Sequence, residues 1–256
     1  MNYICHNEDS VFGVGEHIPA DTVDLVLTAP QERVAASDEE QEAIDAWNEA
    51  WLLHVNRALR LGGNCFLLGR RELLDYLKPI AVLSGLRFRT AFMLDDEKAI
   101  MLMYRDPVPF VRGMLKALQA SARMTGRQID EQFRMSGTGG TWYCFTGKSA
   151  RLPSKAQWSV LQTVFDFGYP FEAFAPYYQS IQRGQLQKLM VSNPELFLET
   201  LITAGSREED AVLDPFAGAG DVGAAALAAG RFFYGFEPEG AQYAKLIERL
   251  KEIDRQ

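Results

Sequence analysis

Apolar runs alternate with amphipathic segments along the first part of the chain. The runs at 22–28 (TVDLVLT) and 64–69 (NCFLLG) are apolar almost throughout, as in strands that are buried on both faces. Between them, Ser37 can cap a helix that Gly62 can stop. The apolar side chains of this helix recur at helical spacing: Ile44, Trp47, Trp51, Val55 and Leu59. A second helix is expected over 71–85, so the alternation predicts an α/β fold with a parallel-rich sheet covered on both faces.

The same alternation continues to residue 105 and returns near the end of the chain. Two strands at 86–94 and 99–105 are separated by the polar turn DDEK, which predicts an antiparallel hairpin at a sheet edge. The last part of the chain is expected to form a helix, a strand, a helix, a strand and a final helix, at 193–206, 211–216, 222–230, 231–237 and 239–253. The segment between these two parts is therefore interpreted as an insertion.

The segment 107–185 lacks this alternation. Helical periodicity is found at 110–124, 125–135 and 155–165, and a polar, glycine-rich stretch precedes the last of these. Residues 105–188 contain 11 Lys and Arg against 5 Asp and Glu, although the net charge of the whole chain is −8. The pattern predicts a helical insertion, and its basic character favours a polyanion-facing segment. The alternative, a chance asymmetry among surface loops, stays open at this point.

Composition narrows the class of protein. The chain has 256 residues, of which 47% are hydrophobic and 23% charged, which is typical of a globular protein. It contains no apolar run of membrane-spanning length, and its first residues, MNYICHNEDS, do not resemble a secretory signal. We therefore expect a cytoplasmic protein that is not associated with a membrane.

The cysteines and histidines have neither disulfide nor metal-ligand spacing. The cysteines are scattered, as in a protein of a reducing compartment: Cys5, Cys65 and Cys144. The histidines share no metal spacing, and no metal is expected at any of them: His6, His17 and His54. The adjacent pair Cys5-His6 does not suit a zinc site either.

A glycine-rich turn, LDPFAGAGDVG (213–223), follows one of the late strands. Gly218, Gly220 and Gly223 match G-x-G-x-x-G, a pattern whose backbone can approach a nucleotide closely. A dinucleotide fold needs two mononucleotide halves around such a turn, but only one strand and two helices follow. Glu237 ends that strand and could accept hydrogen bonds from both hydroxyls of a ribose. We expect one nucleoside with a tail; a nicotinamide-binding oxidoreductase and a turn kept for packing are the alternatives.

At this point the sequence resembles a known family. NPELFLETLITAGSREEDAVLDPFAGAGDVGAAALAAGRFFYGFEPEGAQYAKLIERL is similar to the C-terminal third of the permuted (β-group) S-adenosylmethionine-dependent DNA amino-methyltransferases, which act on adenine N6 or cytosine N4. Near the N-terminus, NEDSV and IPADTVDLVLTAP resemble the start of the catalytic half of that family. Because the catalytic half comes first in the permuted order, the resemblance accounts for a ligand-binding turn so late in the chain.

The resemblance implies a Rossmann-like methyltransferase sheet with helices on both faces. It assigns residues 1–104 to the catalytic half, 105–185 to a mainly helical, basic target-recognition insertion, and 186–256 to the cofactor-binding half of the same domain. The implied cofactor is S-adenosylmethionine. The implied partner is DNA, and a homodimer is expected because members of the family are often dimers.

The resemblance also implies which residues hold the cofactor. They are Asp9, Asn193, Pro194, Asp214, Phe216, Gly218, Gly220 and Glu237. The glycine turn would wrap the methionine and ribose end, Glu237 would bind the ribose hydroxyls, and Asp9 would face the adenine amino group. Asn193-Pro194 would start the helix beside the methionine moiety, where the family usually has Lys-Pro.

The catalytic loop of the family reads Asp, Asn or Ser, then Pro-Pro and an aromatic residue, whereas this chain has TAPQER. The aligned catalytic positions are Thr28, Ala29, Pro30 and Gln31, and Glu32 falls on the aromatic position. In the family, a side-chain oxygen and a proline carbonyl accept hydrogen bonds from the target amino group, and the ring stacks on a flipped base. Ala29 has no side-chain acceptor and Glu32 has no ring.

Two interpretations of this loop remain open. In the first, Thr28, Gln31 or Glu32 offers the oxygen. Trp142 or Tyr143 then stacks the base, and the chain methylates a base amino group, adenine N6 being favoured over cytosine N4. In the second, the chain is a catalytically silent or redirected relative that binds S-adenosylmethionine together with DNA or a partner protein. We carry the first interpretation forward.

The insertion resembles a segment of methyltransferases from phages and prophages, which suggests a phage or restriction-modification setting. The candidate DNA-binding residues are Arg127, Arg134, Trp142, Tyr143, Lys148 and Arg151. The cations could neutralise phosphates, and the rings, with Phe145, could stack on or wedge beside a flipped base. Alternatively, the aromatic residues form the core of the insertion, which is the interpretation we favour for Trp158 and Phe165.

Overall fold

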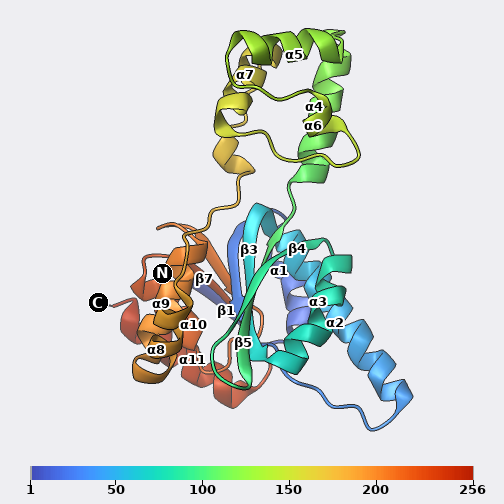
Figure 1. Ribbon diagram of the computed structural model, residues 1–256. Coiled ribbons are helices and arrows are strands. Elements are labelled where there is room, and N and C mark those ends of the chain that lie inside the picture. The colour runs from blue at the N-terminus through green and yellow to red at the C-terminus, as the bar shows by residue number, and fades with distance from the viewer. Residues whose placement is uncertain (1, 256) are drawn as a thin grey trace. The chain divides into compact units, whose positions relative to one another are not determined.

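The computed structural model describes residues 2–255 and consists of two compact units (Figure 1). The first unit, called the α/β unit, comprises the chain up to Arg105 and from Tyr177 onward; the second, called the insertion, is Asp106–Pro176. Within the described residues the α/β unit contains a seven-stranded sheet. Its strands are β1 (Tyr3–His6), β2 (Val23–Thr28), β3 (Leu59–Arg70), β4 (Leu86–Met93), β5 (Lys98–Arg105), β6 (Ala211–Asp214) and β7 (Phe232–Phe236).

The strands are arranged in the order β1-β7-β6-β2-β3-β5-β4. The first five of these run parallel, whereas β5 pairs antiparallel with both β3 and β4. The predicted α/β class and the antiparallel hairpin at one sheet edge are therefore confirmed. The chain passes from β6 to β7 on one side and from β2 towards β3 on the other, so β6 and β2 flank the point where open α/β sheets bind ligands.

Helices cover both faces of the sheet, as predicted. One face packs against α1 (Ser10–His17), α2 (Asp38–Ala58) and α3 (Arg71–Leu83). The other packs against α8 (Arg183–Ser192), α9 (Pro194–Gly205), α10 (Asp221–Ala228) and α11 (Gly240–Ile253). Each face has its own apolar core, because alternate residues of the buried strands point to opposite sides: Leu25, Leu27 and Phe66 to one, Val26, Cys65 and Leu67 to the other. None of the described helices is both long and apolar enough to cross a membrane.

Some elements differ from the sequence pattern. The helix expected to stop at Gly62 ends at Ala58, because Leu59 turns to an extended conformation and pairs with Val23 as the first residue of β3. Leu59 is fully buried in the strand. An apolar residue at this position also fits the spacing of the preceding helix, so the sequence pattern does not distinguish the two. The pattern gives no sign of β1, α1 or α8; β1 has only four residues, and α8 has a single buried side chain, Leu186.

The insertion ends earlier than predicted. The sequence pattern extended it to residue 185, but the compact unit ends at Pro176. The amide of the buried Asn64 in β3 donates hydrogen bonds to the carbonyl oxygens of Tyr177 and Gly205. Tyr178 and Ile181 then pack on the core beneath α9 and α10. The residues after Pro176 therefore belong to the sheet unit.

The insertion is helical, as expected. It comprises α4 (Val108–Ala122), α5 (Gly126–Met135), α6 (Tyr143–Thr146), α7 (Lys155–Phe165) and the 3₁₀ turn η1 (Phe171–Ala173). Its core is aromatic: the Phe133 ring meets Phe145 edge-on with centroids 5.6 Å apart, and Trp158 contacts Phe174 at 5.3 Å. The predicted core role of Trp158 is confirmed, since its side chain is 1% exposed.

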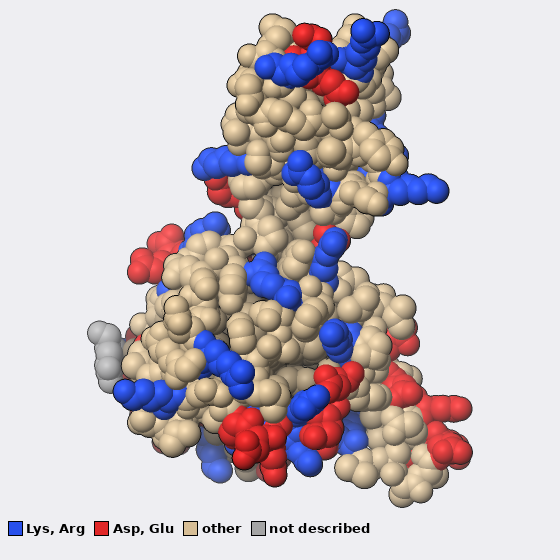
Figure 2. Space-filling view, viewed as in Figure 1, with Lys and Arg blue, Asp and Glu red and all other residues tan. Residues whose placement is uncertain are grey.

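The basic residues of the insertion are scattered rather than gathered into one patch, as Figure 2 shows for the face in view. Three of the basic residues counted over 105–188 belong to the α/β unit: Arg105, Arg183 and Lys188. Two of those within the insertion are paired with acids, Arg134 with Glu131 and Lys155 with Glu172. The cationic excess of the insertion is therefore smaller than the sequence count indicated.

Replacing Ser154 by alanine is expected to lower the free energy of unfolding by about 1 kcal/mol. Ser154 caps α7 in a reciprocal box: its hydroxyl accepts the Gln157 amide at 3.3 Å, and the Gln157 side chain accepts the Ser154 amide at 2.9 Å. The matched control is Ser159→Ala. The Ser159 hydroxyl only donates a hydrogen bond to the Lys155 carbonyl oxygen of the same helix, so it caps no free backbone amide. Urea unfolding followed by circular dichroism measures the free energy of unfolding of both variants. Equal losses of stability in Ser154→Ala and Ser159→Ala would contradict the capping role of Ser154.

Candidate functional site

The carboxyl ends of β2 and β6 are joined by a buried hydrogen bond. Thr28 is fully buried, and its hydroxyl donates to Oδ1 of Asp214 at 2.6 Å. The same carboxylate oxygen accepts the backbone amide of Phe216 at 3.0 Å. The side chain of Thr28 therefore fixes two loops against each other, and it does not line the pocket described below. This location contradicts the expectation that Thr28 offers an oxygen to a substrate.

The glycine turn after β6 combines a ligand-facing and a packing role. Gly218 and Gly220 both adopt left-handed backbone angles, with φ of +52° and +91°. No atom lies within 4 Å of the point where a Cβ of Gly218 would be, whereas a Cβ on Gly220 would come within 2.7 Å of Leu246. A Cβ on Gly223 would likewise meet Phe233 at 2.7 Å. Of the three motif glycines, only Gly218 faces open space, while the other two allow α10 to pack closely.

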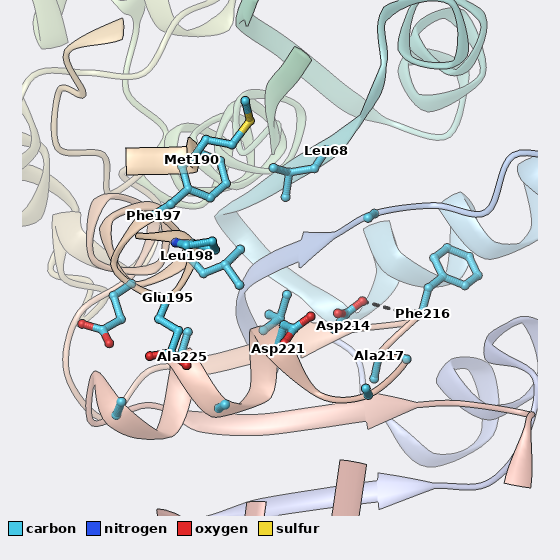
Figure 3. Close-up of a pocket in the computed structure, with 18 of the residues that line it drawn as sticks. Leu68, Met190, Glu195, Phe197, Leu198, Asp214, Phe216, Ala217, Asp221 and Ala225 are labelled. Atoms are coloured by element: carbon cyan, nitrogen blue, oxygen red, sulfur yellow. Dashed lines mark hydrogen bonds between the residues drawn. The ribbon is translucent and has the colours of Figure 1, made fainter. Parts of the chain in front are cut away.

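A pocket of about 750 Å³ lies at this edge of the sheet, within the α/β unit (Figure 3). One wall is the turn from Asp214 to Val222, and the opposite wall is the start of α9 with Phe197 and Leu198. Ala29 lines it from the loop after β2. The sequence-predicted residues that reach the pocket are Ala29, Pro194, Asp214, Phe216 and Gly218. Its walls are mainly apolar, which suits a ligand that is largely buried.

Several predicted cofactor residues instead stabilise the frame of this site. Asp9 caps α1 by accepting the Val11 amide at 2.8 Å, and Asn193 caps α9 by accepting the Leu196 amide at 3.1 Å. Glu237 is buried, and its two oxygens accept the backbone amides of Gly218 and Glu239, each at 2.9 Å. These three side chains therefore hold the segments that surround the pocket and do not themselves line it.

The charges around the pocket are unevenly placed. Burial raises the pKa of the Asp214 carboxyl to about 7, and the carboxylates of Glu237 and Asp221 act in the same direction, against the hydrogen bonds from Thr28 and Phe216. The rim carries Lys98, which is exposed, and Arg249, which pairs with Asp221 and lies 3.7 Å from Glu195. The deepest charge of the site is thus a carboxyl group that is close to half-protonated at neutral pH.

The structure adds residues that sequence reasoning missed. Lys98 reaches the pocket because β5 runs antiparallel to β3, which brings its first residue to the edge where the parallel strands end. The Phe216 ring lies against Trp47 and Trp51 of α2, with centroids 5.5 and 5.2 Å apart. The guanidinium of Arg33 covers the Trp47 ring at 3.7 Å. Only the antiparallel hairpin could have indicated Lys98 in advance.

The catalytic loop places its residues in different environments. Ala29 is exposed at the pocket, whereas Pro30 is buried. Gln31 and Glu32 are exposed and do not line the pocket; a Glu32 oxygen lies 3.6 Å from the Arg70 guanidinium. Ala29 is therefore the loop residue that lines the pocket, and its side chain carries no hydrogen-bond acceptor.

The candidate DNA-binding residues of the insertion divide into exposed and buried ones. Trp142 is 6% exposed, and its indole nitrogen donates to Gln119 Oε1 at 2.7 Å. The expectation that Trp142 stacks on a base is therefore wrong, because its ring belongs to the insertion's core beside Phe165. Phe145 is also buried. The residues that remain exposed are Arg127, Arg134, Tyr143, Lys148 and Arg151.

Comparison with known proteins connects this site to one family. Residues 142–249 match the family model described as DNA methylase, N6_N4_Mtase. The chain is 24% identical over 258 aligned positions to the DNA adenine methyltransferase YhdJ of Escherichia coli, covering 92% of this chain and 78% of that protein. The type II methyltransferase M2.DpnII of Streptococcus pneumoniae is 38% identical over 63 residues, which are 25% of this chain and only 23% of that enzyme.

Solved structures show the same fold over nearly the whole chain. A Thermus thermophilus protein described as a DNA modification methylase, in complex with S-adenosyl-L-methionine, has a TM-score of 0.59 at 18% identity and covers 99% of this chain and 96% of its own. The cytosine-N4-specific PvuII DNA methyltransferase has a TM-score of 0.55 at 14% identity, with coverage of 100% and 91%. At these identities the likeness concerns the fold, and it agrees with the Rossmann-like methyltransferase sheet that the sequence motifs indicated.

Proposed function

We propose that this chain, whose residues 142–249 match the N6/N4 DNA methylase family, transfers a methyl group from S-adenosylmethionine to an exocyclic amino group of a DNA base, adenine N6 in preference to cytosine N4. The observation that carries the proposal is the pocket between β2 and β6, where the open turn at Gly218 faces the catalytic loop at Ala29. The adenine preference is supported by the long alignment with an adenine methyltransferase. We place the reaction in the cytoplasm, a reducing compartment that suits the three free cysteines. We also propose that the chain forms a homodimer, which sedimentation would detect.

The residues present fit S-adenosylmethionine. A pocket of about 750 Å³ has room for a nucleoside with an amino-acid tail. The missing Cβ of Gly218 leaves space for a ligand directly on the backbone of the turn. The buried Glu237 carboxylate accepts the backbone amides of Gly218 and Glu239, and so it holds the turn in the conformation that leaves this space open. Asp214 lines the pocket, and its carboxylate form would favour a positively charged ligand.

The chain's own residues must hold the amino group of the base and accept its hydrogens. Bound S-adenosylmethionine supplies an electrophilic methyl group, and transfer needs the amino lone pair aligned with it. Ala29 is the loop residue at the pocket, and its backbone carbonyl oxygen is the acceptor that we assign to the loop. Asp214 Oδ1 is already taken by Thr28 and Phe216, so Oδ2 of this pocket-lining carboxylate is the side-chain oxygen left to receive an amino hydrogen. A raised pKa suits that oxygen to accept a proton near neutral pH.

A second candidate function is supported by the loop itself. Ala29 stands at the acceptor position, and neither Gln31 nor Glu32 reaches the pocket. A protein with the same fold could therefore bind S-adenosylmethionine and DNA, or a partner protein, without transferring the methyl group. The two candidates differ in one observable, the appearance of a methylated base.

Nucleoside mass spectrometry separates the two candidates. The purified full chain is incubated with S-adenosylmethionine and unmethylated DNA, and the digest is searched for N6-methyladenine and N4-methylcytosine. N6-methyladenine supports the proposal, and N4-methylcytosine corrects its acceptor. If calorimetry detects S-adenosylmethionine binding but no modified base appears, the result supports the second candidate, the catalytically silent protein. If the chain does not bind S-adenosylmethionine, both candidate functions are overturned.

Replacing Arg127 and Lys148 together by alanine is expected to weaken DNA binding. Both side chains are exposed, so each can neutralise a phosphate. The slope of log K against log salt should fall by about 0.9 for each phosphate that the variant no longer neutralises. Fluorescence anisotropy with a labelled duplex at several salt concentrations measures the change.

The matched control removes the same number of charges from the same unit. Arg134 and Lys155 lie 2.5 and 2.6 Å from Glu131 and Glu172, so their charges are already compensated. The double variant Arg134→Ala with Lys155→Ala should change the salt slope less than the Arg127 and Lys148 pair does. Equal slopes in all three proteins would show that the insertion does not bind phosphate through Arg127 or Lys148.

A further inference from the structure

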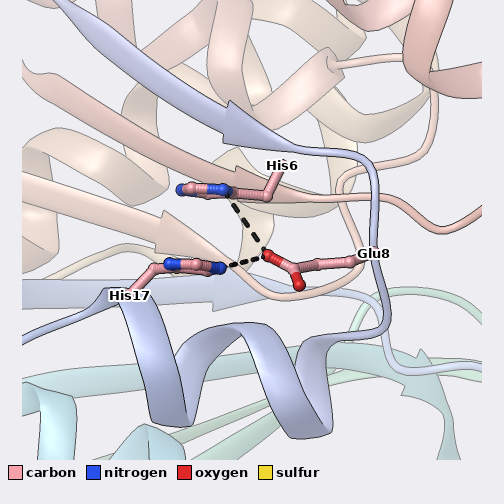
Figure 4. A group of neighbouring side chains, drawn as sticks. All are labelled: His6, Glu8 and His17. Atoms are coloured by element: carbon pink, nitrogen blue, oxygen red, sulfur yellow. Dashed lines mark ion pairs between the residues drawn. The ribbon is translucent and has the colours of Figure 1, made fainter.

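The fold brings together two histidines and a carboxylate that are separated in the sequence (Figure 4). His6 ends β1, Glu8 lies in the turn that follows, and His17 ends α1. Because side chains of a helix tilt towards its N-terminus, His17 points back towards the turn that carries Glu8. Sequence spacing did not indicate this cluster, because His17 comes close to His6 and Glu8 only when α1 has folded.

The three side chains converge on one point. A Glu8 oxygen, Oε1, lies 2.7 Å from His17 Nε2 and 3.5 Å from His6 Nδ1. One ligand-type atom from each residue lies within 4.8 Å of the other two. The two imidazole rings are stacked, with centroids 4.2 Å apart and planes 2° from parallel, and His6 also stacks on Phe236. About a third of each side chain is exposed, so water can reach the cluster.

The donor atoms of the cluster suit a transition-metal ion. Two stacked imidazolium rings would repel each other, whereas a neutral ring offers a lone pair to a cation. One carboxylate facing two neutral imidazoles is a donor set that transition metals prefer and that Ca²⁺ and Mg²⁺ do not.

We propose that His6 Nδ1, His17 Nε2 and the Glu8 carboxylate bind one divalent transition-metal ion, with Zn²⁺ as the best match. Two histidines and one carboxylate with a remaining water position form a common zinc donor set. Binding requires the rings to tilt out of their parallel stack so that both lone pairs meet the ion, a rotation about χ2 whose wells are broad. Their partial exposure leaves room for that rotation.

The position of the cluster gives the ion a structural role. It would tie the end of β1 to the end of α1. Asn7, between the two ligands His6 and Glu8, donates to the carbonyl oxygens of Glu237 and Pro238 at 2.7 and 3.2 Å. A bound ion would therefore also steady the turn after β7. This role does not depend on methyl transfer, and the proposal stands or falls separately from the proposed function.

The test is a titration of the metal-free full chain with Zn²⁺ alone. We expect one equivalent to bind in isothermal calorimetry and to raise the midpoint of thermal unfolding. His6→Ala and His17→Ala should each weaken Zn²⁺ binding by at least tenfold and abolish the thermal shift, and Glu8→Gln should weaken it while keeping the shape of the side chain. Co²⁺ as a spectroscopic probe should show no thiolate charge-transfer band, since no cysteine is in the cluster.

The third histidine provides the matched control. His54 lies on α2 outside the cluster, so His54→Ala should bind Zn²⁺ as the parent does. Circular dichroism without metal checks that each variant is folded, and Glu8→Gln, the most conservative change, keeps the test decisive if a histidine variant unfolds. Absence of stoichiometric binding, unchanged affinity in the cluster variants, or an equal loss in His54→Ala would overturn the proposal.

Discussion

Replacing Gly218 by tryptophan is expected to abolish S-adenosylmethionine binding while the protein stays folded. A Cβ at this position meets no atom within 4 Å, so the indole would extend into the pocket that the turn lines and occupy the volume of the cofactor. The cost to folding is the left-handed backbone, with φ of +52°, which is about 1–2 kcal/mol for a residue other than glycine. Isothermal calorimetry with the cofactor and thermal unfolding of the same sample measure the two effects separately.

Gly230 offers a control with the same backbone cost. Its φ is +74°, and among the described residues beyond its chain neighbours a Cβ would meet only Cγ of Glu208 within 4 Å, at 3.9 Å. Gly230 does not line the pocket. Gly230→Trp should therefore show a similar loss of stability with normal cofactor binding. Normal binding in Gly218→Trp would remove the glycine turn from the cofactor site.

The change Asp214→Asn is expected to remove most of the pH dependence of stability between about pH 4 and pH 7. The folded-state pKa of Asp214 is raised from 3.8 to about 7, mainly by burial. The folded protein therefore binds this proton more tightly than the unfolded chain. The contribution of Asp214 to stability is fully present below pH 4 and is lost as the pH rises through 7. At about 1.4 kcal/mol for each pKa unit, the loss approaches about 4 kcal/mol.

Asparagine keeps the oxygen that Thr28 and Phe216 use, but it carries no charge. Asp214→Asn should consequently be more stable than the parent at pH 8 and equal to it at pH 4, as measured by urea unfolding at a series of pH values. If Asp214 also accepts the amino proton, the methylation rate falls in the same variant. Glu195→Gln is the control, because that pocket residue is exposed and is not among the charges that raise the pKa of Asp214. If the stability of the parent and of Asp214→Asn changes with pH in the same way, the pKa of the Asp214 carboxyl is not raised in the folded protein.

The sequence pattern predicted those parts of the fold that depend on local periodicity. The runs 22–28 and 64–69 are buried central strands, and the polar turn DDEK closes a hairpin at the sheet edge. The end of α2 was misplaced, because Leu59 is equally apolar as the last turn of a helix and as the first residue of a strand. Its pairing with Val23 is a contact between distant segments, which periodicity does not contain.

The site was predictable only in part, for a similar reason. Motif spacing identified Asp214, Phe216 and Gly218, and all three line the pocket. A motif does not distinguish a side chain that holds a ligand from one that caps a helix, as Asp9 and Asn193 do. Nor does it distinguish an exposed ring from a buried one, since Trp142 is flanked by polar and glycine residues and is nevertheless core. Lys98, Trp47 and the pair of histidines depend on tertiary contacts alone.

The residues that flank the insertion, Arg105 and Tyr177, are each held within the α/β unit. Arg105 pairs with Asp21 at 2.5 Å where the chain leaves β5, and Asn64 holds Tyr177 where the chain returns. The α/β unit thus supplies its own attachment for both ends, and the insertion supplies its own aromatic core. We therefore expect the insertion to be exchangeable as a unit, because a graft between Arg105 and Tyr177 needs to match only these two held positions.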